Sequence, residues 1–259
     1  YGHLRSANAA NECGIIAVGG TATCTPVGNN FATGIDYQVN DATIIVQDGV
    51  TISTAAANTS AITSGTPVGN YGNLAVTTNG TVAISTTGAT SHGVFVGTNN
   101  GSVQVTTSGE TSINVSGNNT AGILTYSANA NPITITSQGT ITTSGPGASF
   151  GILSGSTGGN ITITGNSVTQ TGGAVNSTGV YAISLGGNGN VNVTMAGVSS
   201  TAGYGIVAVA SGTGTTSVTT TGPVTAYGTA ITALSLGGTT SVSATGQVTT
   251  TGTTAGNAI

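Results

Sequence analysis

The sequence repeats short runs in which aliphatic and polar residues alternate, and this period of two is the feature that most limits the possible folds. Clear examples are residues 103–105, 133–135, 161–163 and 191–193. Residues two positions apart lie on the same face of a β-strand, so each run presents one aliphatic face and one face of Thr, Gln or Asn. Gly, Asn, Ser and Pro bound the runs, which indicates short strands separated by turns.

Three kinds of run recur in a fixed order, in units of roughly 25–30 residues. The first is the alternating run just described, the second follows a turn that contains Gly or Asn, and the third often follows a glycine, as in Gly122-Ile123-Leu124. The units begin near Asp41, Asn73, Gly101, Pro132, Asn160, Asn190, Thr215 and Thr239. We therefore predict an all-β fold, a right-handed parallel β-helix (β-solenoid) with three strands per coil and about eight coils over residues 41–259. Aliphatic side chains are expected inside the coils, with Thr, Ser and Asn outside.

The chain contains almost no charge. It has one basic residue, Arg5, five acidic residues and a formal net charge of −4 in 259 residues. Abundant Gly, Thr, Val and Ser disfavour helices, and a hydrophobic fraction of 37% argues against disorder. Because there is no basic patch, neither nucleic acid nor an anionic lipid surface is an expected partner. The sequence contains no run of 18 apolar residues, so we expect no membrane insertion by this segment.

Residues 1–40 differ in composition from the repeats, and we interpret them as an N-terminal cap. They contain both cysteines, Cys13 and Cys24, with ten residues between them. We predict a Cys13–Cys24 disulfide that closes this small loop, which implies an oxidising compartment; two unpaired buried thiols are the alternative. The sequence stops at Ile259 in the middle of a unit, so we expect either further protein or another chain to complete the stack.

Candidate catalytic groups are scarce. Polysaccharide-cleaving enzymes that use a parallel β-helix need carboxylates and a base. The acidic residues of this chain are Glu12, Asp36, Asp41, Asp48 and Glu110. A carboxylate pair among Asp36, Asp41 and Asp48 is the catalytic arrangement that this set suggests, and turn or cap positions are the simpler interpretation.

His92 lies in a Ser-His-Gly turn with no acid nearby in the sequence. We interpret it as a surface histidine rather than as the base for a serine nucleophile. No cluster of His and Cys completes a set of metal ligands. Residues 186–191 resemble a calcium-binding nonapeptide only faintly, because Asn stands where Asp would bind. The sequence therefore predicts no catalytic residue, no cofactor-binding residue and no metal site.

Threonine-rich strands make ice binding an alternative function. Residues 134–136, 140–142 and 162–164 place hydroxyl groups on one face of a strand. An ice-binding plane needs the same residues at the same register on many coils. Gln104, Asn192 and Thr219 differ at the corresponding places, which argues against such a plane.

Three N-terminal segments carry a resemblance to a known family. They are Cys-Thr-Pro-Val-Gly-Asn-Asn at residues 24–30, Gly-Ile-Asp-Tyr at residues 34–37 and the strand-like residues 42–50. These segments resemble the start of autotransporter passenger domains from Gram-negative bacteria, and the repeats resemble such passengers over nearly all of the chain. The resemblance implies a β-helix exported to the bacterial cell surface, present here as a cleaved or truncated passenger. It also implies adhesion, aggregation or matrix formation.

Taken together, these features predict a secreted, non-enzymatic cell-surface solenoid with a structural or adhesive role. Because rods of low charge repel one another little, we expect copies of the chain to associate end to end or laterally into fibres or a biofilm matrix. Surface glycans and host or abiotic surfaces are the other expected partners, and no cofactor is expected. The main alternative is a glycan-binding or glycan-cleaving β-helix, and the structural alternative is a trimeric adhesin head with shorter coils.

Overall fold

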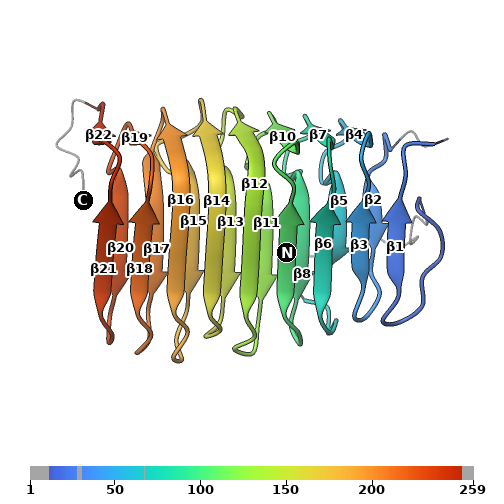
Figure 1. The fold of residues 1–259 in the computed structure, drawn as a ribbon, viewed down its shortest axis with the longest axis horizontal. Helices are drawn as coiled ribbons and strands as arrows, with labels where there is room; N and C mark the ends of the chain where they lie inside the picture. The colour runs from blue at the N-terminus through green and yellow to red at the C-terminus, as the bar shows by residue number, and fades with distance from the viewer. Residues whose placement is uncertain (1–11, 28–30, 67, 253–259) are drawn as a thin grey trace.

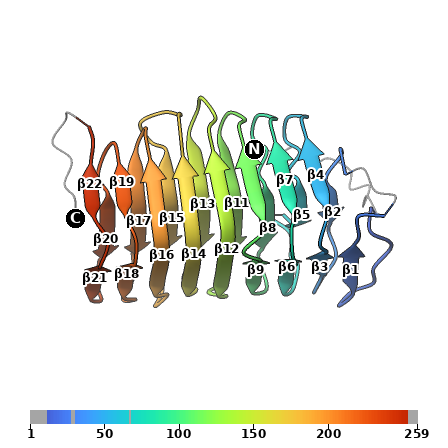
Figure 2. The ribbon, with the colours of Figure 1, turned by 45° about the horizontal axis from the view of Figure 1, so that its top comes forward.

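The computed structural model describes residues 12–27, 31–66 and 68–252, and every regular element among them is a β-strand. Figure 1 shows that the strands wind into one elongated solenoid, whose turns stack along the long axis from the N-terminal to the C-terminal strands. The tilted view in Figure 2 shows the same stacking. Every pairing between these strands is parallel. The predicted all-β parallel solenoid is confirmed.

Each turn contributes strands to three stacks. The first stack comprises β1 (Thr21–Cys24), β3 (Thr43–Val46), β6 (Leu74–Thr78), β9 (Val103–Thr107), β18 (Thr216–Thr220) and β21 (Thr240–Ala244). The second comprises β4 (Thr51–Thr54), β7 (Ala83–Thr86), β10 (Ser112–Val115), β19 (Val224–Ala226) and β22 (Val248–Thr250). The third comprises β2 (Ile35–Tyr37), β5 (Ile62–Gly65), β8 (Val94–Thr98), β11 (Thr120–Ser127), β13 (Ser149–Ser156), β15 (Thr178–Ser184), β17 (Tyr204–Ala210) and β20 (Ile231–Ser235). Its eight strands correspond to the predicted number of coils.

Three long strands belong to both the first and the second stack. They are β12 (Ile133–Thr143), β14 (Ile161–Gln170) and β16 (Val191–Ser200). The N-terminal half of β12 pairs with β9 and its C-terminal half pairs with β10. Only Gln138 and Gly139 separate the two segments of β12 that pair with β14. In these middle turns the corner is so short that the first two predicted strands become one.

The predicted cap contains the first two strands of the solenoid. β1 pairs with β3 and β2 pairs with β5, so residues 21–24 and 35–37 already belong to the stacks. Cys13 and Cys24 form the predicted disulfide, with their Cα atoms 4.8 Å apart, and this bond ties the preceding chain to the end of β1. Residues 1–11 and 28–30 of the predicted cap, which include Arg5, lie outside the described residues, and so does the end of the last unit at Ile259.

The interior consists of aliphatic columns that run along the axis. In the third stack, Ile62, Val94, Ile123 and Ile152 occupy successive positions of one register and have no solvent-exposed surface. Equivalent columns of Ile and Val line the first two stacks. Each aliphatic side chain is buried by the turns above and below it. Burial of apolar surface therefore stabilises a turn only when the turn has neighbours.

Hydroxyl groups at the corner that follows the third stack pair with backbone carbonyls. Ser127 Oγ donates to the Gly101 carbonyl at 3.1 Å, and Ser184 Oγ donates to the Gly159 carbonyl at 3.0 Å. A buried carbonyl without a partner costs about 1–3 kcal/mol. The serines therefore let the chain turn into the next coil without leaving such a group unpaired.

A column of glycines precedes the buried aliphatic residue in the third stack. Its members on five successive turns are Gly93, Gly122, Gly151, Gly179 and Gly205. A Cβ atom at any of them would lie between 2.1 and 2.9 Å from a core methyl group of the second stack, and also close to a backbone carbonyl of the following turn. This close approach explains why glycine recurs before the third aliphatic run of each unit.

Two glycines of β13 test the steric role of this column. In Gly151→Ala the new Cβ would lie 2.1 Å from Val168 Cγ1 and 2.5 Å from the Gly179 carbonyl oxygen. We expect overpacking to lower the free energy of unfolding, measured by urea denaturation, by about 2 kcal/mol or more.

Gly155→Ala is the matched control in the same strand, because its nearest neighbour would be Tyr126 Cδ2 at 3.8 Å. We expect its free energy of unfolding to stay within about 0.5 kcal/mol of the parent value. Equal destabilisation by both substitutions would contradict the steric explanation.

Candidate functional site

Three of the five acidic residues act as turn residues. Asp41 Oδ1 accepts a hydrogen bond from the Asn73 amide at 2.8 Å, and Asp48 Oδ1 accepts one from the Thr81 amide at 2.7 Å. Glu110 Oε2 accepts a hydrogen bond from Thr81 Oγ1 at 3.0 Å. Asp41 precedes β3 and Asp48 follows it, so the two lie at opposite ends of a strand. The structure does not bring them together as a carboxylate pair.

Asp36 lies near Glu12 instead, and sequence reasoning missed this pair because 23 residues separate its members. Burial raises the pKa of both carboxyl groups, and the charge of Asp36 raises that of Glu12 further. Gln38 Nε2 donates to Asp36 Oδ2 at 3.4 Å. Glu12 Oε2 and Asp36 Oδ1 are buried without a hydrogen-bond partner among the described residues. Among all the described residues, no group of three or more His, Cys, Asp or Glu side chains lies close enough together to hold a metal ion.

His92 is not the surface histidine that the sequence suggested. The ring is mostly buried, and its Nδ1 accepts a hydrogen bond from the Ala121 amide one turn later, at 3.0 Å. It also stacks on Phe95, with ring centroids 6.2 Å apart and an angle of 30° between the planes. Burial lowers the pKa of His92 to about 4. The neutral imidazole thus substitutes for a backbone acceptor between two turns.

The outward surface of the first stack carries hydroxyl and amide groups. One outward column contains threonine on six successive turns: Thr77, Thr106, Thr136, Thr164, Thr194 and Thr219. The neighbouring column is mixed and includes Gln104, Thr134 and Asn192. The structure therefore places Thr219 in a regular column, whereas Gln104 and Asn192 interrupt the column beside it.

The outward surface of the third stack is apolar, so the predicted exterior of Thr, Ser and Asn is wrong for this face. One outward column contains Phe95, Leu124, Leu153, Tyr181 and Val207, in register on successive turns. A second column adds Tyr126, Ile183, Val209 and Leu234, with Gly97 before Tyr126 and Gly155 between Tyr126 and Ile183. The residues that flank them in β8, β11, β13, β15 and β17 are buried, which fixes their outward direction, and Leu234 in β20 is itself exposed. We call these nine apolar side chains the apolar strip.

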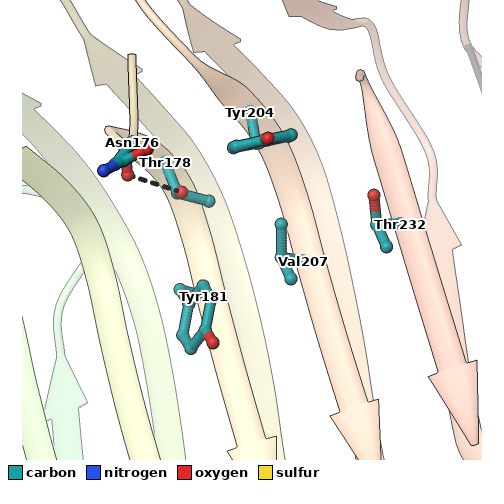
Figure 3. Close-up of a pocket in the computed structure, with 6 residues that line it drawn as sticks. All are labelled: Asn176, Thr178, Tyr181, Tyr204, Val207 and Thr232. Carbon is teal, nitrogen blue, oxygen red and sulfur yellow. Dashed lines mark hydrogen bonds between the residues drawn. The ribbon is translucent and has the colours of Figure 1, made fainter. Parts of the chain in front are cut away.

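A groove lies at the C-terminal end of the apolar strip, with a volume of about 400 Å³. Figure 3 shows Val207 in its middle, with Tyr181 and Thr232 on either side and Tyr204 near the start of β17. Asn176 and Thr178 complete its lining. No local pattern in the sequence predicts this groove, because its residues come from three different turns.

The C-terminal part of the chain has no charged side chains. Residues 111–259 contain no Asp, Glu, Lys, Arg or His. Both the apolar strip beyond Phe95 and the groove therefore belong to a surface without formal charge. Among the described residues there is also no helix that is long and apolar enough to cross a membrane.

No protein-family profile, no curated protein sequence and no solved structure matches this chain. Function must therefore be inferred from the fold and from the two kinds of outward surface, the hydroxyl columns and the apolar strip.

The depressed pKa of His92 predicts a loss of stability in acid. A histidine in the unfolded chain titrates near 6.5, whereas folded His92 titrates at about 4, so the unfolded state binds more protons between these values. Stability is expected to fall as the pH drops from about 6.5 to about 4, by roughly 2–3 kcal/mol from this residue. Urea unfolding at pH 7 and at pH 4 measures the loss.

His92→Asn is the comparison variant, because its side-chain oxygen can accept the Ala121 amide and does not titrate. We expect a smaller loss of stability between pH 7 and pH 4 in the variant. Glu12 and Asp36, whose pKa values are raised, act in the opposite direction but contribute equally to both proteins. The same pH dependence in both proteins would contradict the assignment to His92.

Proposed function

We propose that this protein is a secreted, non-enzymatic structural or adhesive solenoid whose copies pair laterally through the apolar strip. The observation that carries the proposal is the strip itself, a column of outward Phe, Leu, Tyr and Val side chains on five successive turns. Exposed apolar patches of this extent mark interaction surfaces in soluble proteins. Pairing would bury side chains that the solenoid alone leaves partly exposed to water.

The third stack has the dimensions of a stable interface. The six strands that carry the apolar strip, spaced by about 4.8 Å, give a face about 29 Å long, and their lengths of five to eight residues give it a width of about 20 Å. The resulting area of roughly 580 Å² per partner lies close to the lower end of the ~600–1,000 Å² that each partner contributes to a specific protein interface. Two strips packed face to face therefore offer enough surface for a specific contact.

Electrostatics do not oppose this association. Beyond Glu110 the chain has no formal charge, so two copies experience little mutual repulsion. The Thr, Ser and Asn side chains of the first stack remain in contact with water when the apolar strips pack together. The hydroxyl-bearing surface therefore favours solubility, whereas the apolar strip favours association. We accordingly assign the adhesive contact to the apolar strip and not to the polar columns of the first stack.

Two features support a cell-surface location of the kind expected for an autotransporter passenger. The Cys13–Cys24 disulfide is typical of proteins that mature in an oxidising compartment. The parallel solenoid of about eight turns is the architecture that the resemblance implied. A rigid rod built from neighbouring turns is well suited to display a long contact surface outside the cell.

Leu124→Asp tests the pairing. Leu124 lies in the middle of the apolar strip, between Phe95 and Leu153 in register. A carboxylate there would have to be desolvated in the interface, so we expect self-association to weaken at least about tenfold. Sedimentation velocity over a range of protein concentrations measures it.

Thr134→Asp adds the same charge to the hydroxyl face in the neighbouring strand β12, where Thr134 is exposed. We expect this control to associate like the parent protein. A parent chain that stays monomeric at high concentration would refute the pairing, and equal weakening by both variants would attribute association to net charge instead of the strip.

A further inference from the structure

The groove owes its shape to unequal connections between the second and third stacks. Seven residues, 171–177, connect β14 to β15, whereas three residues, 201–203, connect β16 to β17. Asn176, the penultimate residue of the longer connection, lines the groove and is exposed. A long loop beside a short one leaves a step in the surface, and the groove lies at this step.

Two tyrosines border the groove, and the side chain between them is smaller. Val207 pairs in register with Tyr181 on one side and with Thr232 on the other. Tyr204 is 40% exposed and pairs with Thr178. Phe150 packs edge-to-face against Tyr181, with ring centroids 6.1 Å apart and an angle of 73° between the planes. This contact holds the Tyr181 ring in place, and Figure 3 shows the Tyr181 and Tyr204 rings beside Val207.

The polar groups of the groove are uncharged and available. Within the described residues, neither the Tyr181 nor the Tyr204 hydroxyl makes a hydrogen bond, and the Asn176 side-chain amide makes none. Thr178 Oγ1 donates to the backbone carbonyl of Asn176 at 3.5 Å and not to its side chain. The side-chain amide of Asn176 is therefore free to bind a ligand. The groove therefore combines two aromatic rings with amide and hydroxyl donors and acceptors.

We infer that this groove binds a neutral saccharide, a function that goes beyond lateral pairing and competes with it, because Tyr181 and Val207 line the groove and also belong to the apolar strip. Aromatic faces carry partial negative charge and attract the C–H groups on the apolar face of a sugar ring. Amide and phenol groups can then pair with the sugar hydroxyls. The volume of about 400 Å³ falls within the range of small-ligand sites. Because no charged residue follows Glu110, the groove offers no partner to an acidic sugar.

A peptide fits the groove less well than a saccharide. Peptides commonly bind by adding a strand to a free sheet edge. Both β15 and β17 already have a neighbouring strand on each side, so their backbone groups are occupied. A proline-rich peptide, which binds aromatic grooves without a strand edge, serves as the competing probe.

Calorimetric titration of the wild-type chain with cellohexaose, chitohexaose and maltohexaose tests the inference, with oligogalacturonate and decaproline as comparison ligands. We expect at least one neutral oligosaccharide to bind, with an affinity that salt leaves unchanged because no ion pair forms. Tyr181→Ala and Tyr204→Ala should each weaken binding at least about tenfold. Tyr227→Ala is the matched control, because Tyr227 is also 40% exposed but does not line the groove.

Each outcome decides the question. Binding that is lost in both groove variants and kept in Tyr227→Ala supports the inference. No binding of any neutral oligosaccharide overturns it, as does equal binding by all three variants or tighter binding of oligogalacturonate or decaproline. Repeating the titration with Leu124→Asp separates this result from self-association, because that variant keeps the groove residues intact and is expected to self-associate at least about tenfold more weakly.

Discussion

Backbone hydrogen bonds between successive turns are the interaction on which the rest of this molecule depends. Every strand pairs in parallel with the strand one turn earlier or later, and residues of equal role stay in register even though the turns differ in length. Register is kept because a slip of one residue would exchange the buried and the outward side chains. The glycine column allows the turns to come close at one corner, and the serines of the next corner pair with its carbonyls.

This constraint divides the residues into two groups with different freedom. Inward positions are mostly aliphatic or small, since each packs against the same position on the adjacent turns. Outward positions have no such restriction, and the two outward surfaces have diverged. The first stack carries hydroxyl and amide groups, whereas the third carries Phe95, Leu124, Leu153, Tyr181 and Val207. We therefore expect contacts with other molecules at the outward columns. The apolar column gains the most from such contacts, because they remove apolar side chains from water.

Alternation and turn residues were sufficient to predict the parallel solenoid, its inward columns and the disulfide, because these features follow from local periodicity and from a single cysteine pair. The outward surface was harder to predict. The aliphatic neighbours Ile123 and Leu124 look alike in the sequence, and only the register shows that one points inward and the other outward. Equally, no local pattern joins Glu12 to Asp36, His92 to Ala121 or Tyr181 to Val207, since each pair meets through the winding of the chain.

The unequal lengths of the corner connections have an evolutionary consequence. The strands are fixed by pairing, but the connections at residues 171–177 and 201–203 lie between strands and can gain or lose residues at little cost to the stability of the stack. A change of a few residues at one corner can open or close a depression over an unchanged scaffold. Surface recognition in such a rod could thus diversify by insertion and deletion at the corners, while the wound framework is inherited intact.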